Sequence, residues 1–207
     1  MSEGYADRAV GFGTRLAVST VFPVDVRITP PWDGASLTPR PGDTFVLMLR
    51  NLTDADLERV LEINHANVPA VGGATADHLS GLVASSSIAV VSLVDGEVAG
   101  FCIVLGPDAD YDSVNYLWFM EHHPTAMYLD RVAFDARFHG QGLGSEMYAE
   151  VDRLIRLEQP TATGLTLEVN VDPPNEPSLA FHRKLGFSEV GRQMSAGIEV
   201  SLMHRPL

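Results

Sequence analysis

The chain has a single cysteine, Cys102, in 207 residues. One thiol cannot form an internal disulfide framework, and such a sequence is typical of a reducing compartment. Basic residues are also scarce, because 14 Lys and Arg stand against 27 Asp and Glu, which gives a formal net charge of -13. This charge disfavours nucleic-acid binding through phosphate neutralisation and favours a cationic partner such as an amine.

Long apolar runs are missing as well. No stretch reaches the roughly 20 residues of a membrane span, and the apolar patch after Arg15 ends at Pro23 and Asp25 without a clear cleavage pattern. We therefore predict a cytoplasmic protein with neither a membrane nor a nucleic-acid partner. His122, His123 and His139 lack the spacing of metal ligands, because adjacent histidines point apart, and we expect no metal site.

The apolar content of 45% is enough for one full core, so we expect one domain rather than two. Residues 1–43 are rich in Gly, Pro, Ser and Thr, with turn signals such as Pro30-Pro31-Trp32-Asp33-Gly34. We predict an N-terminal extension over 1–43 and one domain over 44–207. Three interpretations of the extension stay open: a flexible leader, a wrongly assigned start, or one extra strand around Val21 to Ile28.

From Thr44 onwards the sequence alternates between strand and helix patterns. Apolar runs predict strands over 45–49, 88–93, 98–105, 127–134 and 165–171, with two last strands near 189–192 and 198–203. Asp95-Gly96 predicts a hairpin turn. Helical spacing predicts helices after Thr53, over 75–84, from Leu143 to a stop at Gln159-Pro160, and after Asn175.

The chain is organised around residues 128–158, which combine a short strand, the turn Arg-Phe-His-Gly-Gln-Gly-Leu-Gly over 137–144, and a long helix. Glycines at alternate positions leave backbone amides uncovered at a helix N-terminus, where the dipole favours an anion. This pattern predicts a diphosphate cradle with Arg137 as a cation at its mouth, and a plain tight turn is the alternative. The spacing fits neither the dinucleotide fingerprint nor the P-loop, because the third glycine comes one residue early and no Lys follows.

The remaining pattern, Arg-x-x-Gly-x-Gly after a strand, resembles the acyl-CoA signature of the GCN5-related N-acetyltransferases. Residues 175–187, Asn-Glu-Pro-Ser-Leu-Ala-Phe-His-Arg-Lys-Leu-Gly-Phe, are similar to a second motif of that family. The resemblance covers roughly Thr44 to Leu202. It implies the GNAT fold, an α/β (α+β sandwich) fold with a mixed, mostly antiparallel sheet of six to seven strands and about four helices.

The resemblance also implies acetyl-CoA (coenzyme A) as the cofactor. In the family, the main chain of the fourth strand binds the pantetheine and the thioester oxygen, and a motif Asn contacts the CoA arm. Helix capping alone is the alternative for Asn175. The residues expected to bind the cofactor are Val132, Ala133, Phe134, Arg137, His139, Gly140, Gln141, Gly142, Leu143, Gly144, Ser145 and Asn175.

Two side chains are the expected catalytic residues. Glu168 lies on the polar face of its strand, and relatives with Glu at this point use it to deprotonate the amine; partial burial would raise its pKa toward a useful range. His182 stands where most members have a Tyr that protonates the leaving thiolate. A protonated imidazole can do this, because its ordinary pKa of about 6.5 lies below that of a thiol. The alternatives are that Glu168 faces solvent or pairs with a cation, and that His182 makes local hydrogen bonds.

The connection over 106–126 is long for a compact domain and predicts a lid. Aromatic walls with carboxylates suit an ammonium group, and an edge-covering or dimerising loop is the alternative. The residues expected to bind substrate are Tyr111, Asp112, Asn115, Tyr116 and Trp118. Some uncharacterised predicted acetyltransferases of the superfamily resemble the chain more closely, because they share the runs 111–119, 130–131 and 168–175. That similarity implies that the lid, the fifth strand and His182 form one site.

Together these features predict an acetyl-CoA-dependent N-acetyltransferase, an acyltransferase of the EC 2.3.1 type. It would transfer the acetyl group directly to the amine of a small molecule or to an N-terminal amine, with Glu168 as base and His182 as acid. The alternative is a catalytically silent acyl-CoA-binding sensor or interaction module. Homodimers are common in the family, so a homodimer is a further expectation.

Overall fold

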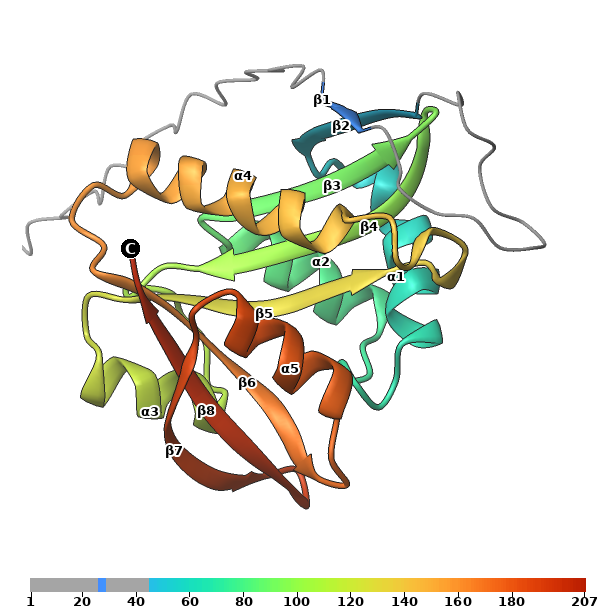
Figure 1. Cartoon of the computed structure of the whole chain (residues 1–207). Helices are drawn as coiled ribbons and strands as arrows, with labels where there is room; N and C mark the ends of the chain where they lie inside the picture. Colours follow the sequence, from blue (N-terminus) through green and yellow to red (C-terminus); the bar gives the residue numbers. More distant parts are fainter. Residues whose placement is uncertain (1–25, 29–44) are drawn as a thin grey trace, which may run out of the picture.

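The computed structural model describes residues 26–28 and 45–207 (Figure 1), and the predictions made for the rest of 1–43 lie outside the described residues. Its centre is an eight-stranded sheet in the order β1-β2-β3-β4-β5-β6-β8-β7. The strands are β1 (Val26–Ile28), β2 (Phe45–Asn51), β3 (Ile88–Val94), β4 (Glu97–Leu105), β5 (Met127–Phe134), β6 (Gly164–Asp172), β7 (Ser188–Ser195) and β8 (Ile198–Pro206). β1 falls within the range where an extra strand was one interpretation, and it takes the sheet beyond the predicted six to seven strands.

Five α-helices accompany the sheet in the described part of the chain, against the predicted four or so. They are α1 (Leu57–Ala66), α2 (Ala76–Ser85), α3 (Val114–His122), α4 (Leu143–Glu158) and α5 (Glu176–Lys184), with short 3-10 turns at η1 (Asp54–Asp56) and η2 (Ala136–Phe138). The additional helix, α3, lies within the connection over 106–126. Tyr116 and Phe119 are buried at a spacing of three, so this helix is fixed to the body of the protein by its apolar face.

The helices cover both faces of the sheet (Figure 1). One core cluster packs α4 and α5 against the sheet and includes Met147, Tyr148 and Leu179. The cluster on the opposite face packs α1, α2 and α3 and includes Val60, Leu79 and Phe119. Because both faces are covered, the central strands are apolar on both sides, and Cys102 on β4 is one of their fully buried residues.

β5 and β6 separate soon after they meet. They are the one parallel pair among the described strands, and their pairing is limited to Met127 with Leu165 and Tyr128 with Thr166. Beyond these pairs the two strands diverge, as Figure 1 shows, while β4 continues to pair with β5 and β8 with β6. The central sheet is therefore split between β5 and β6, and this split positions the site described below.

Local signals set the ends of the elements near that split. Asp95 and Gly96 have φ of 50° and 85°, as a tight hairpin of this kind requires. Asn175 caps α5, because its side-chain oxygen accepts a hydrogen bond from the backbone N–H of Ser178 at 3.2 Å.

Within residues 26–28 and 45–207, no helix combines the length and the apolar content needed to cross a bilayer.

A pair of glycine substitutions tests the packing of β4 against β5. A Cβ at Gly100 would lie 2.9 Å from the carbonyl oxygen of Ala133 and would collide with the ring of Phe134. We expect Gly100→Ala to lower the free energy of unfolding by about 1–3 kcal/mol, as overpacking does. The control is Gly81→Ala on the exposed surface of α2, where a Cβ meets nothing within 4 Å. It should raise stability by about 0.5–1 kcal/mol. Equal urea midpoints for the two variants would contradict this packing.

Candidate active site

The glycine turn between β5 and α4 has the backbone that an anion cradle needs. Gly140 and Gly142 have φ of 74° and 83°, a left-handed conformation that L side chains rarely adopt, and both are exposed. Gly142 directly precedes the first residue of α4. Gly144 serves a different purpose, because a Cβ there would lie 3.0 Å from the ring of Phe181 on α5. The turn therefore presents open main chain at a helix N-terminus and lets α4 and α5 pack closely.

A cavity of about 540 Å³, here called the cofactor groove, runs from this turn along β5 to α5. Ten of the twelve residues expected to bind the cofactor line it: Val132, Ala133, Phe134, His139, Gly140, Gly142, Leu143, Gly144, Ser145 and Asn175. Residues of α4 and α5 close its far side, among them Tyr148, Ser178, Phe181 and His182.

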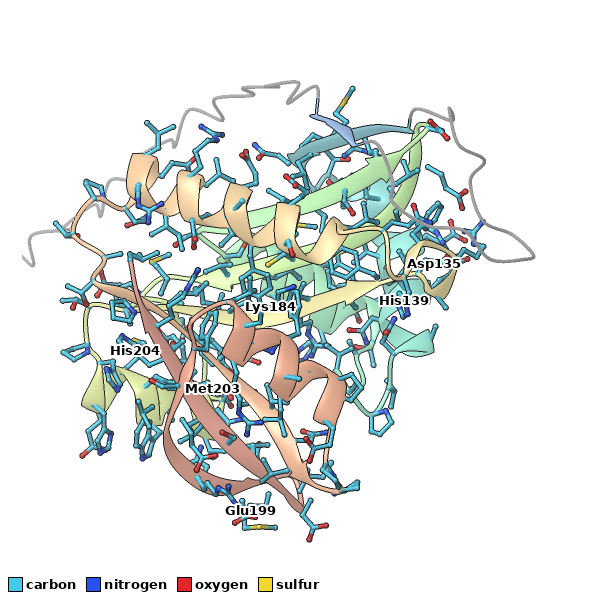
Figure 2. The ribbon with its side chains drawn as sticks, viewed as in Figure 1. Asp135, His139, Lys184, Glu199, Met203 and His204 are labelled. Atoms are coloured by element: carbon cyan, nitrogen blue, oxygen red, sulfur yellow. The ribbon has the colours of Figure 1, made fainter. Side chains whose placement is uncertain are left out.

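The other two residues expected to bind the cofactor, Arg137 and Gln141, do not line this groove in the described part of the chain. Arg137 forms ion pairs with Asp135, at 2.8 Å, and with Glu97. Asp135, which lies beside His139 where β5 ends (Figure 2), is also paired with Arg59. These guanidinium groups hold the pKa of Asp135 well below its usual range. Two carboxylates thus fix Arg137 beside the turn.

A second cavity of about 190 Å³, here called the acidic pocket, adjoins the groove. Its ionisable carboxylates are Asp130 and Glu168, which come from β5 and β6 on either side of the split. Five residues line both cavities: Ala70, Val71, Val132, Ser178 and His182. The groove and the acidic pocket therefore meet where β5 approaches α5.

Glu168 is a buried carboxylate that titrates near neutral pH. The hydroxyl of Tyr128 donates to both carboxylate oxygens, at 2.8 and 3.0 Å. Burial raises the pKa of Glu168 to about 7, and the negative charge of Asp130 adds to the shift. The hydrogen bonds from Tyr128 and Asn115 act in the opposite direction. This environment gives the carboxylate the pKa that a general base needs.

Asp130 has two direct partners, Tyr111 from the segment before α3 and Arg131, the next residue of β5. The hydroxyl of Tyr111 donates to it at 2.7 Å, and Nε of Arg131 lies 3.1 Å from its other oxygen. Arg131 is itself fixed, because it donates to the side-chain oxygen of Asn64 at 2.8 Å and to the carbonyl of Gly72 at 2.6 Å. Burial raises the pKa of Asp130 despite these partners.

Both ring nitrogens of His182 have partners. Nδ1 lies 2.7 Å from the carbonyl oxygen of Ser178, which can only accept, so Nδ1 carries the proton and donates. Nε2 lies 2.6 Å from the hydroxyl of Tyr148 and accepts from it. Burial lowers the pKa of His182, and the positive charge of Arg205 acts in the same direction. The resting imidazole is therefore neutral, with the local hydrogen bonds that the sequence analysis had named as the alternative.

The five residues expected to bind substrate are spread more widely. Asn115 lines the acidic pocket, and Tyr111 reaches it through Asp130. Tyr116 is buried and donates to the carbonyl of Gly106 at 2.9 Å. Trp118 stacks on His122 with ring centroids 3.9 Å apart, and Asp112 is exposed. Within the described residues, Tyr116, Trp118 and Asp112 line neither cavity.

Three residues of the site had no predicted role: Tyr128, Asp130 and Tyr148. Asp130 was noted only as part of a shared run, and Tyr128 was placed only at the start of the stretch over 128–158, in the strand predicted over 127–134. Tyr148 follows Met147 in the apolar stripe of α4 and comes four residues after Gly144, so its helical spacing placed it on the buried face. A polar hydroxyl within such a stripe is a signal, because a buried phenol needs a partner.

Comparison with known proteins agrees with this geometry. The family model described as the Acetyltransferase (GNAT) family matches residues 54–187. The chain belongs to the GNAT family. This result confirms the resemblance found in the two motifs. The match extends from η1 to the end of the second motif.

The relatives of this GNAT protein differ in how much they share with it. An uncharacterized N-acetyltransferase YesJ of Bacillus subtilis (strain 168) is 28% identical over 101 residues, which are 49% of this chain and 53% of YesJ. The chain thus spans about half the length of that relative. Ard1 from Thermoplasma volcanium has a similar fold, with a TM-score of 0.60 and 22% identity over 78% of this chain and 97% of Ard1.

A third similar structure is the aminoglycoside acetyltransferase AAC(6')-Ib in complex with coenzyme A. Its TM-score is 0.60, with 22% identity over 77% of this chain and 94% of that chain. At this identity the likeness establishes the fold. The predicted GNAT architecture is therefore confirmed, and the family to which the chain belongs uses acetyl-CoA.

The protonation state of His182 can be measured directly. We expect nitrogen NMR of the imidazole to report a proton on Nδ1 and none on Nε2 at pH 7, with a pKa below the ordinary value of about 6.5. His204, which is half-buried and whose imidazole stacks on His123, provides a second signal, and His204→Gln assigns it. A His182 signal that titrates above about 6.5 would contradict the hydrogen-bond pattern.

Proposed function

We propose that the chain is an acetyl-CoA-dependent N-acetyltransferase in which Glu168 is the general base. The observation that carries the proposal is the meeting of the two cavities at Val132, Ser178 and His182. One cavity ends in an open glycine cradle, and the other contains a carboxylate whose pKa is about 7. Direct transfer between two bound molecules needs such a junction, because the acyl carbon and the amine must come into contact.

The groove fits coenzyme A. Exposed amides of Gly140 and Gly142 at the N-terminus of α4 would hold the diphosphate. The lining residues of β5, Val132 to Phe134, would hold the pantetheine arm, which would lead from the glycine turn toward the junction of the cavities. Bound acetyl-CoA would supply an activated acyl group, and the residues around the junction would bind the amine and accept its proton.

The acidic pocket fits an amine. Asp130 and Glu168 attract an ammonium group, and the described lining carries no Lys or Arg to oppose them. Glu168 then accepts a proton from the ammonium, so that the nitrogen lone pair becomes available for attack on the acyl carbon. Tyr128 holds the carboxylate in place through two hydrogen bonds during this transfer.

The size of the pocket limits what can enter. A water molecule's share of liquid volume is about 30 Å³, so a cavity of about 190 Å³ has room for roughly the volume of six waters. A small amine fits whole, and a larger molecule or a peptide can insert only the end that bears the amine. Both acceptor types named from the sequence, a small molecule and an N-terminal amine, therefore remain within the proposal.

Glu168→Gln tests the base. In the wild type, acetyl transfer should rise with pH through about 7 as Glu168 loses its proton. The variant should lose that rise and be about a hundredfold slower or more, the amount that a general base contributes. The measurement is the rate of free-thiol release across pH. Glu62→Gln, an exposed change on α1, is the matched control. Full activity of Glu168→Gln at all pH values would disprove the assignment.

The same variant separates catalysis from folding. The folded-state pKa of Glu168 is raised above its ordinary value, so the wild type loses stability as pH rises through about 7. Gln carries no charge, and we expect Glu168→Gln to melt at a higher temperature than the wild type above pH 7. A variant that is slow and also less stable at pH 8 would indicate misfolding instead of a lost base.

An acceptor panel tests the charge of the pocket. We expect propylamine to be acetylated at least about tenfold faster, in kcat/KM, than β-alanine, because a carboxylate on the acceptor is repelled by Asp130 and Glu168. Asp130→Asn should narrow this preference. Thiol release with each amine is the measurement, and equal rates would contradict an acidic acceptor site. If CoA binds but no amine in a broad panel is turned over, the sensor alternative replaces the enzyme.

A further inference from the structure

A buried pair of side chains, Tyr148 of α4 and His182 of α5, lies where the two cavities meet. The hydroxyl oxygen of Tyr148 is 2.6 Å from Nε2 of His182, and the two residues are only 2% and 5% exposed. Tyr148 lines the cofactor groove, and His182 lines both cavities. The pair therefore stands beside the place where the proposed reaction would release a thiolate.

Geometry prevents His182 from acting on the thiolate directly. Its Nδ1 faces the carbonyl of Ser178 and its Nε2 faces the oxygen of Tyr148, so both nitrogens are occupied. The phenol is different, since a hydroxyl can accept one hydrogen bond while it donates another. If His182 becomes protonated, Nε2 changes from acceptor to donor, and the hydrogen of the Tyr148 hydroxyl is released toward the groove.

The surroundings keep this pair in one position. The ring of Tyr148 packs edge-on against Phe181 and Phe187, with centroids 5.7 and 5.9 Å apart. The ring of His182 packs edge-on against Phe187 at 5.5 Å. Such contacts fix the ring planes of both residues.

The ionisable groups around the pair come from several elements. Cys102 of β4, Asp152 of α4 and Arg205 of β8 act electrostatically on Tyr148, and Arg205 also acts on His182. Arg205 is paired with Asp152 at 2.5 Å, which offsets its charge. Glu168 of β6 lines the acidic pocket together with His182. A negative charge that develops on sulfur beside the pair would favour protonation of His182.

We propose that Tyr148 is a catalytic residue that donates a proton to the leaving sulfur, and that His182 is a positioning residue that replaces this proton. The inference rests on the proposed function. As the carbon–sulfur bond breaks, its electron pair stays on sulfur, the O–H bond of Tyr148 breaks and an S–H bond forms. The Nε2–H proton of protonated His182 moves to the oxygen of Tyr148 in the same step. His182 ends neutral, as in the resting structure, and takes up its next proton from solvent.

This inference gives a physical account of the His182 departure in the second motif. The resemblance implies a phenol at that position of α5, and here α4 supplies the phenol from Tyr148 instead. The helices come close enough for this because Gly144 leaves room for Phe181. The site thus keeps a hydroxyl at the junction, although its sequence position has changed.

The test follows the thiol of bound coenzyme A and needs no acceptor. The ultraviolet absorbance of the thiolate is titrated against pH for CoA bound to the wild type, Tyr148→Phe, His182→Gln and His204→Gln. We expect the ionisation constant of the bound thiol to fall about tenfold or more in Tyr148→Phe, the effect of losing a hydrogen bond to a charged group. His182→Gln keeps an acceptor for the phenol but has no ionisable proton, so its shift should have the same sign and be smaller.

His204→Gln should leave the titration unchanged. His204 lies on β8, far from His139 at the glycine-turn end of the cofactor groove (Figure 2), and it lines neither cavity in the described part of the chain. Thermal melting establishes that each variant is folded. A bound thiol that titrates identically in the wild type and in folded Tyr148→Phe overturns the inference, even if amines are acetylated. If the thiol titration shifts in Tyr148→Phe but no amine is turned over by the wild type, the contact between the phenol and the sulfur is supported and the proposed function is disproved.

Discussion

The parallel contact between β5 and β6 extends over two residue pairs, and the rest of the site depends on its shortness. Where the strands diverge, their backbones no longer form hydrogen bonds with each other. Side chains from α4, α5 and the segment after α1 line the cavities that open there. The cofactor groove is built along β5 and the acidic pocket between the two strands. A fully paired sheet would bury Glu168 and Val132 in a continuous core, with no place for two molecules to meet.

Burial gives the polar groups at the split their properties. Glu168, Asp130 and His182 all have pKa values shifted so that the neutral form is favoured, because each is desolvated. Each is also paired with a phenol, since Tyr128, Tyr111 and Tyr148 donate to them in turn. A buried phenol satisfies its neighbour without adding charge, so the site stays acidic overall and Glu168 titrates near pH 7.

Much of the fold could be predicted because its signals are local. The bounds of β5 and the stop of α4 agree with the apolar runs and with Gln159-Pro160. α3 was missed because its sequence mixes apolar and polar residues with little helical periodicity, and only its packing against the body reveals it. In the site, Glu168 and the glycine turn were predicted from the strand pattern and the motifs. Asp130 belonged to a shared run that gave it no role, and Tyr148 belonged to no motif.

The sequence by itself determined the main-chain features of this GNAT protein. Gly140 and Gly142 adopt left-handed angles that glycine reaches without strain, and the periodicity around them sets the strand and the helix. Only the tertiary structure decided which side chains form hydrogen bonds with each other. Tyr148 meets His182 across 34 positions and Tyr128 meets Glu168 across 40. Such contacts, and the desolvation that tunes them, arise when distant elements pack together, and no local pattern encodes them.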